Sequence, residues 1–68
     1  MIVKYLNKGN EFIEFNLNND LSGFISALQA SETIDVNSNT YQLEGFELRT
    51  IGEDNSVLHQ LLVFLTEK

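Results

Sequence analysis

The residue types able to do chemistry are few in this chain and stand apart from one another. His59 is the only histidine and there is no cysteine, so a zinc-type set of nitrogen and thiolate ligands has no second member. His59 falls within an apolar strand pattern, and we place it on the core face opposite Leu48. A single histidine in such a place is more often a packed side chain than a base or a ligand.

The carboxylates include two close pairs, Glu11 with Glu14 and Glu44 with Glu47. Paired carboxylates can act as acid and base at one bond, but here they are typical of solvated strand positions. The acidic turn at residues 52–55 lacks the spacing of a calcium-binding loop. No serine lies in a Gly-x-Ser-x-Gly motif, and the four glycines are too dispersed for a phosphate-binding loop. We therefore expect no enzymatic activity, no cofactor and no bound metal.

Arg49 is the only arginine, and a guanidinium group is well suited to hold a phosphate. Tyr5, Tyr41 and His59 could add stacking and polar contacts, giving a small-ligand site of the nucleotide type at the interfaces of an oligomer. The simpler interpretation of Arg49 is a cross-strand ion pair near Glu47. Both interpretations stay open at this point.

The charge balance limits the classes of partner. Four Lys and Arg residues face ten Asp and Glu, for a formal net charge of −6. The basic residues are too few and too scattered to follow a phosphate backbone, so we expect no direct binding to nucleic acid or to an anionic membrane. The acidity suits a soluble protein or one with a basic partner. A further possibility is mimicry of DNA by dispersed acids, namely Glu11, Glu14, Glu32, Asp35, Glu44, Glu47, Glu53 and Asp54.

These side chains must be positioned by short strands and a single helix. Leu21, Phe24, Ile25 and Leu28 fall at i, i+3, i+4 and i+7, which predicts a helix that is capped by Asn19 or Asp20 and ends near residue 30. Its glycine, Gly23, is expected to let the helix approach the sheet closely. Strands are predicted at residues 2–6, 11–17, 33–36, 40–51 and 56–66.

The resulting fold class is α+β, a single domain over residues 1–68 with the order β-β-α-β-β-β. We expect an antiparallel sheet with the helix packed on a face. Tyr41 and Leu43 are apolar at odd positions, whereas Phe46 and Leu48 are apolar at even ones, which predicts a β-bulge near Gly45. With a four-residue turn at 52–55, this bulge brings Leu43 opposite Val63 and Tyr41 opposite Leu65. The predicted core face comprises Ile13, Phe15, Phe46, Leu48, Val57, Leu61, Val63 and Leu65.

The last strand is too apolar for a sheet with one wet face, because residues 61–65 are apolar at every position. The opposite face of this strand has no evident cover within so short a chain. Such a patch usually marks an interface, so we expect a homodimer or a higher homo-oligomer. The alternative is a sheet that curls and covers both faces itself. The predicted interface residues are Phe12, Ile51, Leu58, Leu62 and Phe64.

The start of the chain enters a strand pattern at once, at residues 1–5, without the basic and apolar regions of a signal peptide. The longest apolar run is also far too short to span a membrane. A cytoplasmic location is therefore expected.

In style the chain resembles small orphan proteins of phages and mobile elements in AT-rich Gram-positive bacteria. The resemblance rests on the immediate strand at residues 1–5, the Asn-rich turns and the closing pattern Tyr41-x-Leu43 with residues 61–65. It implies an inhibitor or adaptor of a host protein and transfers no functional residue. The function expected is thus that of a small acidic non-catalytic binding protein, with a ligand-binding protein and a DNA mimic as alternatives.

Overall fold

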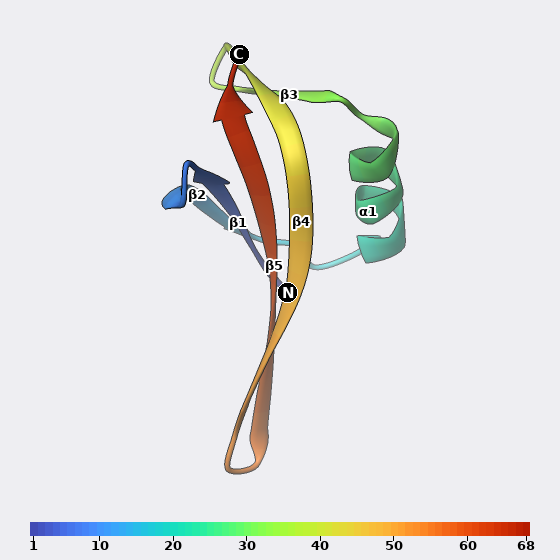
Figure 1. Ribbon diagram of the computed structural model, residues 1–68. Coiled ribbons are helices and arrows are strands. Elements are labelled where there is room, and N and C mark those ends of the chain that lie inside the picture. The colour runs from blue at the N-terminus through green and yellow to red at the C-terminus, as the bar shows by residue number, and fades with distance from the viewer.

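The computed structural model describes residues 1–68 as a five-stranded sheet with one helix. The first strands form a hairpin, the helix follows it, and a short strand leads into a long hairpin that ends the chain (Figure 1). The elements are β1 (Ile2–Asn7), β2 (Asn10–Asn16), α1 (Leu21–Ala30), β3 (Thr33–Val36), β4 (Asn39–Glu53) and β5 (Ser56–Glu67). The predicted order of elements is confirmed.

The sheet is mixed, in the order β2-β1-β5-β4-β3. β1 runs parallel to β5, with Val3 beside Leu61 and Tyr5 beside Val63, while the other neighbours are antiparallel. The prediction of a purely antiparallel sheet is therefore wrong. The physical reason is the connection through α1, which carries the chain from β2 at one edge to β3 at the other. After such a crossover a strand can run parallel to its neighbour in the sheet, as β5 does beside β1.

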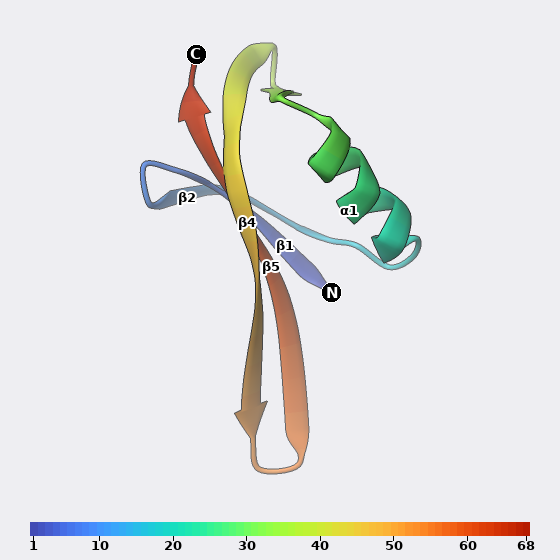
Figure 2. The same ribbon diagram turned by 45° about the vertical axis from the view of Figure 1, so that its right-hand side comes forward.

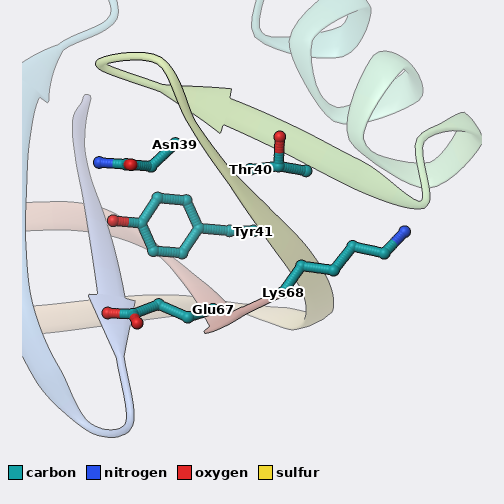
Figure 3. Close-up of a pocket in the computed structure, with 5 residues that line it drawn as sticks. All are labelled: Asn39, Thr40, Tyr41, Glu67 and Lys68. Carbon is teal, nitrogen blue, oxygen red and sulfur yellow. The ribbon is translucent and has the colours of Figure 1, made fainter.

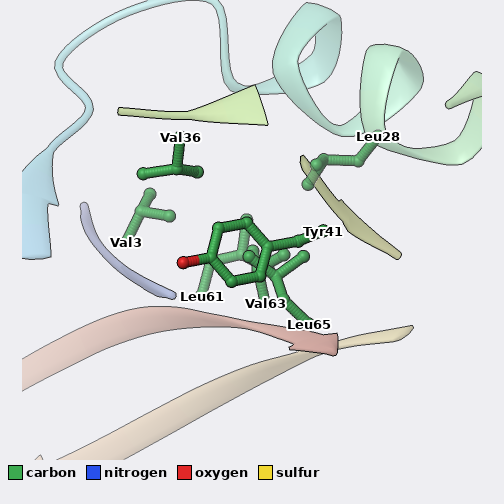
Figure 4. Packing of buried hydrophobic residues seen from close by; sticks show 7 residues of the cluster. All are labelled: Val3, Leu28, Val36, Tyr41, Leu61, Val63 and Leu65. Atoms are coloured by element: carbon green, nitrogen blue, oxygen red, sulfur yellow. The ribbon is translucent and has the colours of Figure 1, made fainter. Parts of the chain in front are cut away.

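The core lies where the curled sheet meets the helix (Figure 4). Val3 and Val63 are fully buried, and Val36 of edge strand β3 belongs to the same cluster as Val3 of β1. Of the predicted core residues, Ile13, Phe15 and Phe46 are partly buried against this cluster. Leu48 and Val57 were wrongly assigned to the core, since they are 57% and 59% exposed. The cluster consists of Val3, Leu28, Val36, Tyr41, Leu61, Val63 and Leu65.

The helix begins after Asp20, whose carboxylate accepts a hydrogen bond of 3.2 Å from the Gly23 N–H. It buries Leu28, and Phe24 packs edge-on against Phe15 with ring centroids 6.0 Å apart. Gly23 does not serve a close approach to the sheet as expected. A Cβ atom built at Gly23 would instead collide with the capping carboxylate of Asp20.

The pairing of β4 with β5 shifts its register between Leu43 and Gly45. A β-bulge is one way to produce such a shift, so the bulge near Gly45 stays a prediction. The pairing is displaced by two residues from the expected one, because the turn contains two residues and not four. Leu43 accordingly faces Leu65 and not Val63. A displacement of two keeps every side chain on its predicted face of the sheet.

Candidate interaction surface

The β4–β5 hairpin extends beyond the rest of the sheet. β3 pairs with β4 only as far as Gln42, and β1 pairs with β5 only from Gln60 onward. Residues 50–59 therefore form a two-stranded segment without a neighbouring strand on either side, which projects away from the helix and the other strands (Figures 1 and 2). We call residues 50–59 the arm.

Every residue of the arm is exposed, including three large apolar side chains. Ile51 and Leu58 lie opposite each other on one face, and Val57 lies on the other face. A two-stranded hairpin is at best marginally stable in water without packing on at least one face. A contiguous exposed apolar patch is typical of a surface that binds a partner, and on the arm only Ile51 and Leu58 adjoin on one face.

The polar groups of the arm are acidic at its tip. Glu53 and Asp54 lie at the turn, and no Lys or Arg occurs in residues 50–59. His59 lies opposite Thr50, with the threonine Oγ1 3.1 Å from His59 Nδ1, and is exposed. His59 keeps its predicted face, but the prediction that it packs opposite Leu48 is wrong, since the two-residue turn moves its partner by two positions and leaves it exposed on the arm.

The predicted interface residues separate into two groups. Ile51 and Leu58 are exposed on the arm, whereas Leu62 is only 4% exposed and Phe64 is partly buried. Leu62 lies in the middle of the sheet, flanked by Lys4 of β1 and Glu47 of β4. The monomer thus covers Leu62, which the sequence could not indicate without the pairing of β1 with β5.

Phe12 lies away from the other predicted interface residues. The register of β1 with β2 shifts so that Tyr5 faces Ile13 and Leu6 faces Glu11, which leaves Phe12 without a partner of its own. Its ring centroid lies 5.3 Å from that of Tyr41 and 6.5 Å from that of Tyr5. Phe12 therefore joins an aromatic cluster that spans β1, β2 and β4.

The residues predicted for a small-ligand site are not brought together. Arg49 lies 3.5 Å from Glu47 on the same strand, so its ion pair is not the cross-strand pair expected. His59 lies on the other face of the hairpin from Arg49, and Tyr5 and Tyr41 flank Phe12. Burial raises the pKa of Tyr5 above its ordinary value.

Two surface hollows are present. One of about 200 Å³ opens beside Tyr41 at the end of β5, and the other, of about 360 Å³, lies where the arm leaves the sheet. Asn39, Thr40, Tyr41, Glu67 and Lys68 line the first (Figure 3). Met1, Ile2, Asn16, Val57, Leu58 and His59 line the second. The second hollow thus continues the apolar surface of the arm toward the start of β1.

The acidic residues do not form an unbroken array. Lys4 Nζ lies 3.4 Å from Glu11 and 3.7 Å from Glu14, which offsets the charge of both carboxylates on β2. Arg49 does the same for Glu47. The spacing of uncompensated charges therefore gives little support to mimicry of a DNA backbone.

No group of three or more His, Cys, Asp or Glu side chains is arranged to hold a metal ion. No helix has the length and apolar character needed to cross a membrane. Comparison of the chain with protein-family models, with curated proteins and with solved structures finds no match.

Proposed function

We propose that this chain is a small acidic binding protein without catalytic chemistry, which inhibits or recruits another protein by attaching its arm. The observation that carries this proposal is the exposure of Ile51, Val57 and Leu58 on a segment that no other part of the chain covers. Fully burying an exposed side chain of this size contributes about 1.5–3 kcal/mol, and about half of each of these side chains is still exposed. A partner that covers the arm therefore gains affinity and also stabilises the hairpin.

The chemistry of the arm suggests the kind of protein surface it fits. Its apolar side chains require an apolar groove, and Glu53 and Asp54 at the tip favour Lys or Arg at the rim of that groove. The net charge of −6 acts in the same direction over longer distances by steering the chain toward a basic surface.

The two alternative functions have less support. A nucleotide-type ligand needs Arg49 near His59 and the tyrosines, and these side chains lie on different parts of the fold. A DNA mimic needs rows of free carboxylates, and Lys4 and Arg49 pair with three of the acids.

The proposal is tested by affinity capture from cells that naturally express the protein. We expect the variant carrying both Val57→Thr and Leu58→Thr to lose its partner, with affinity weakened by more than about tenfold, because two buried apolar contacts are removed. Thr is β-branched, as Val is, and favours strands. Isothermal titration with the recovered partner gives the affinity.

The matched control is Ser56→Thr, an equally exposed change in the same strand that removes no apolar contact. It should bind as the unmodified protein does. Retention of the partner by the double variant, or recovery of no partner at all, would contradict the proposal.

A further inference from the structure

β4 presents a long edge of unpaired backbone. β3 pairs with only Asn39–Gln42 of β4. The next residue, Leu43, donates its N–H to the Glu32 carbonyl at 3.0 Å. No strand pairs with residues 44–53 on that side, and we call them the free edge. Glu44 and residues 47–53 are also exposed, which leaves this part of the free edge accessible.

Natural proteins usually protect such an edge with proline, with charged side chains, lysine above all, with a β-bulge or with a covering segment. The free edge contains neither proline nor lysine. It does carry charge of both signs near its centre, with Glu47 and Arg49 on the same face of the strand and Leu48 between them on the opposite face. A free edge of this kind is a template for another strand, and its charges decide which strand fits.

We propose that the free edge pairs with the free edge of a second copy of this chain, antiparallel about a two-fold axis, with Leu48 opposite the partner's Leu48. The proposal does not rest on the proposed function, since it uses the backbone edge of β4 and leaves Val57 and Leu58 available on β5.

Symmetry restricts the register of this pairing. In an antiparallel pair, two residues that lie opposite each other point to the same face of the sheet. In a symmetric dimer this holds only if one residue lies opposite its own copy, with the two-fold axis between them. Centring on Glu47 sets two carboxylates against each other and drives Glu53 against the partner's Tyr41, where β3 already occupies the edge. Centring on Arg49 sets two guanidinium groups against each other. Like charges directly opposite in a sheet are destabilising.

Centring on Leu48 removes both conflicts. Glu47 then lies opposite the partner's Arg49, and Arg49 lies opposite the partner's Glu47, so each ion pair of 3.5 Å within a strand gains a second one across the interface. The pairing then joins residues 44–52 of the two copies, and Glu53 lies just beyond it, beside the partner's Leu43 and the end of β3. This register therefore gives the longest overlap that β3 permits together with complementary charge.

The side chains also fit in this register. Leu48, which is 57% exposed in the monomer, packs against the partner's Leu48 at the axis. Ile51 lies opposite the partner's Gly45, whose missing side chain leaves room beside the partner's Phe64. The hairpins then form a four-stranded antiparallel unit, and the arm of each copy gains the neighbouring strand that it lacks alone.

Single cysteines test the register directly. The chain contains no cysteine, so a disulfide in a single-cysteine variant can only join two copies. Directly opposite residues of an antiparallel pair have Cα atoms about 4.5–5.5 Å apart, which falls within the range of a disulfide. Under mild oxidation we expect Leu48→Cys to cross-link at least about tenfold faster than Glu47→Cys or Arg49→Cys, measured by non-reducing electrophoresis.

A charge exchange tests the proposal without any cross-link. Glu47→Arg alone and Arg49→Glu alone each set like charges opposite one another at two places, and we expect the Kd of the dimer to rise about tenfold. The double variant restores opposite charges and should return the Kd to near its starting value. Sedimentation equilibrium gives these constants, and both residues are exposed, so the fold tolerates the changes.

The outcomes separate this proposal from the proposed function. A monomer at every concentration, fastest cross-linking at position 47 or 49, or no recovery in the double charge variant would overturn the edge-paired dimer. The Val57→Thr, Leu58→Thr variant should remain dimeric even where it loses its protein partner. A loss of dimer in that variant would also overturn the proposal, since it would place the contact on the arm faces.

Discussion

At the scale of single residues, Asp20 and Gly23 act as one unit at the start of α1. Asp20 has a positive φ of 50° and caps the helix through the Gly23 N–H. Gly in a helix interior costs about 1 kcal/mol relative to Ala, and the loss of an N-cap costs about the same. A side chain at position 23 would displace the capping carboxylate.

A double-mutant cycle measures this coupling. In the unmodified protein we expect Gly23→Ala to change the free energy of unfolding by less than about 0.5 kcal/mol, since the gain in helix propensity and the loss of the cap offset each other. In a background carrying Asp20→Ala, Gly23→Ala should stabilise by about 1 kcal/mol, because no cap remains to be lost. Urea denaturation gives both values, and equal effects in the two backgrounds would refute the coupling.

Tyr5 gives the chain a dependence on alkaline pH. Burial disfavours the phenolate, so the pKa of Tyr5 in the folded chain lies above the ordinary value of about 10. Its contribution to stability is complete below pH ~10 and is lost as the pH rises through the folded pKa, because the unfolded state then releases the proton first.

We therefore expect the free energy of unfolding to fall above pH ~10, and Tyr5→Phe to remove this part of the fall. Denaturant unfolding at stepped pH gives the slope. Tyr41→Phe is the matched control and should leave the contribution of Tyr5 in place. If the free energy of unfolding falls above pH ~10 as steeply in Tyr5→Phe as in the unmodified protein, Tyr5 is not the cause of the fall.

At the scale of elements, β5 consists of two parts with different surroundings. Its second half passes through the middle of the sheet, where Leu61, Leu62, Val63 and Leu65 are all buried. Its first half belongs to the arm, where Val57 and Leu58 are exposed. The same kind of apolar residue thus stabilises the monomer in one half of the strand and is available to partners in the other half.

This difference is measurable by truncation. Leu62→Ala should destabilise the monomer by about 2–4 kcal/mol through lost burial and a cavity, whereas Leu58→Ala should cost less than about 1 kcal/mol because Leu58 is 54% exposed. Thermal unfolding at a low protein concentration gives both values. Similar costs for the two changes would contradict the assignment of Leu58 to an uncovered surface.

At the scale of the whole molecule, the arm makes the chain elongated. The radius of gyration is 12.6 Å, against about 11 Å for a compact domain of this length. Only 8 of the 68 residues are buried, and small domains have little stability to spare. Cover from a second copy or from a protein partner would supply burial that the monomer lacks.

Much of the local structure could be predicted from particular residues. Alternation of apolar residues located the strands, the stripe from Leu21 to Leu28 located the helix, and Asp20 was named as a possible cap. These features depend on neighbours close in sequence, whose geometry follows from the periods of strand and helix. Of the residues predicted to face a partner, Ile51 and Leu58 are exposed and Leu62 is buried, and their role at an interface stays a prediction.

Local patterns in the sequence specify the elements and their order, because the side-chain periods of strand and helix are local properties. The parallel pairing of β1 with β5, which covers Leu62 and leaves residues 50–59 without neighbouring strands, becomes visible only in the folded chain. That pairing joins segments about 60 residues apart along the chain. No local pattern specifies it, since it depends on how the helix connection spans the sheet and on which arrangement buries the most apolar surface.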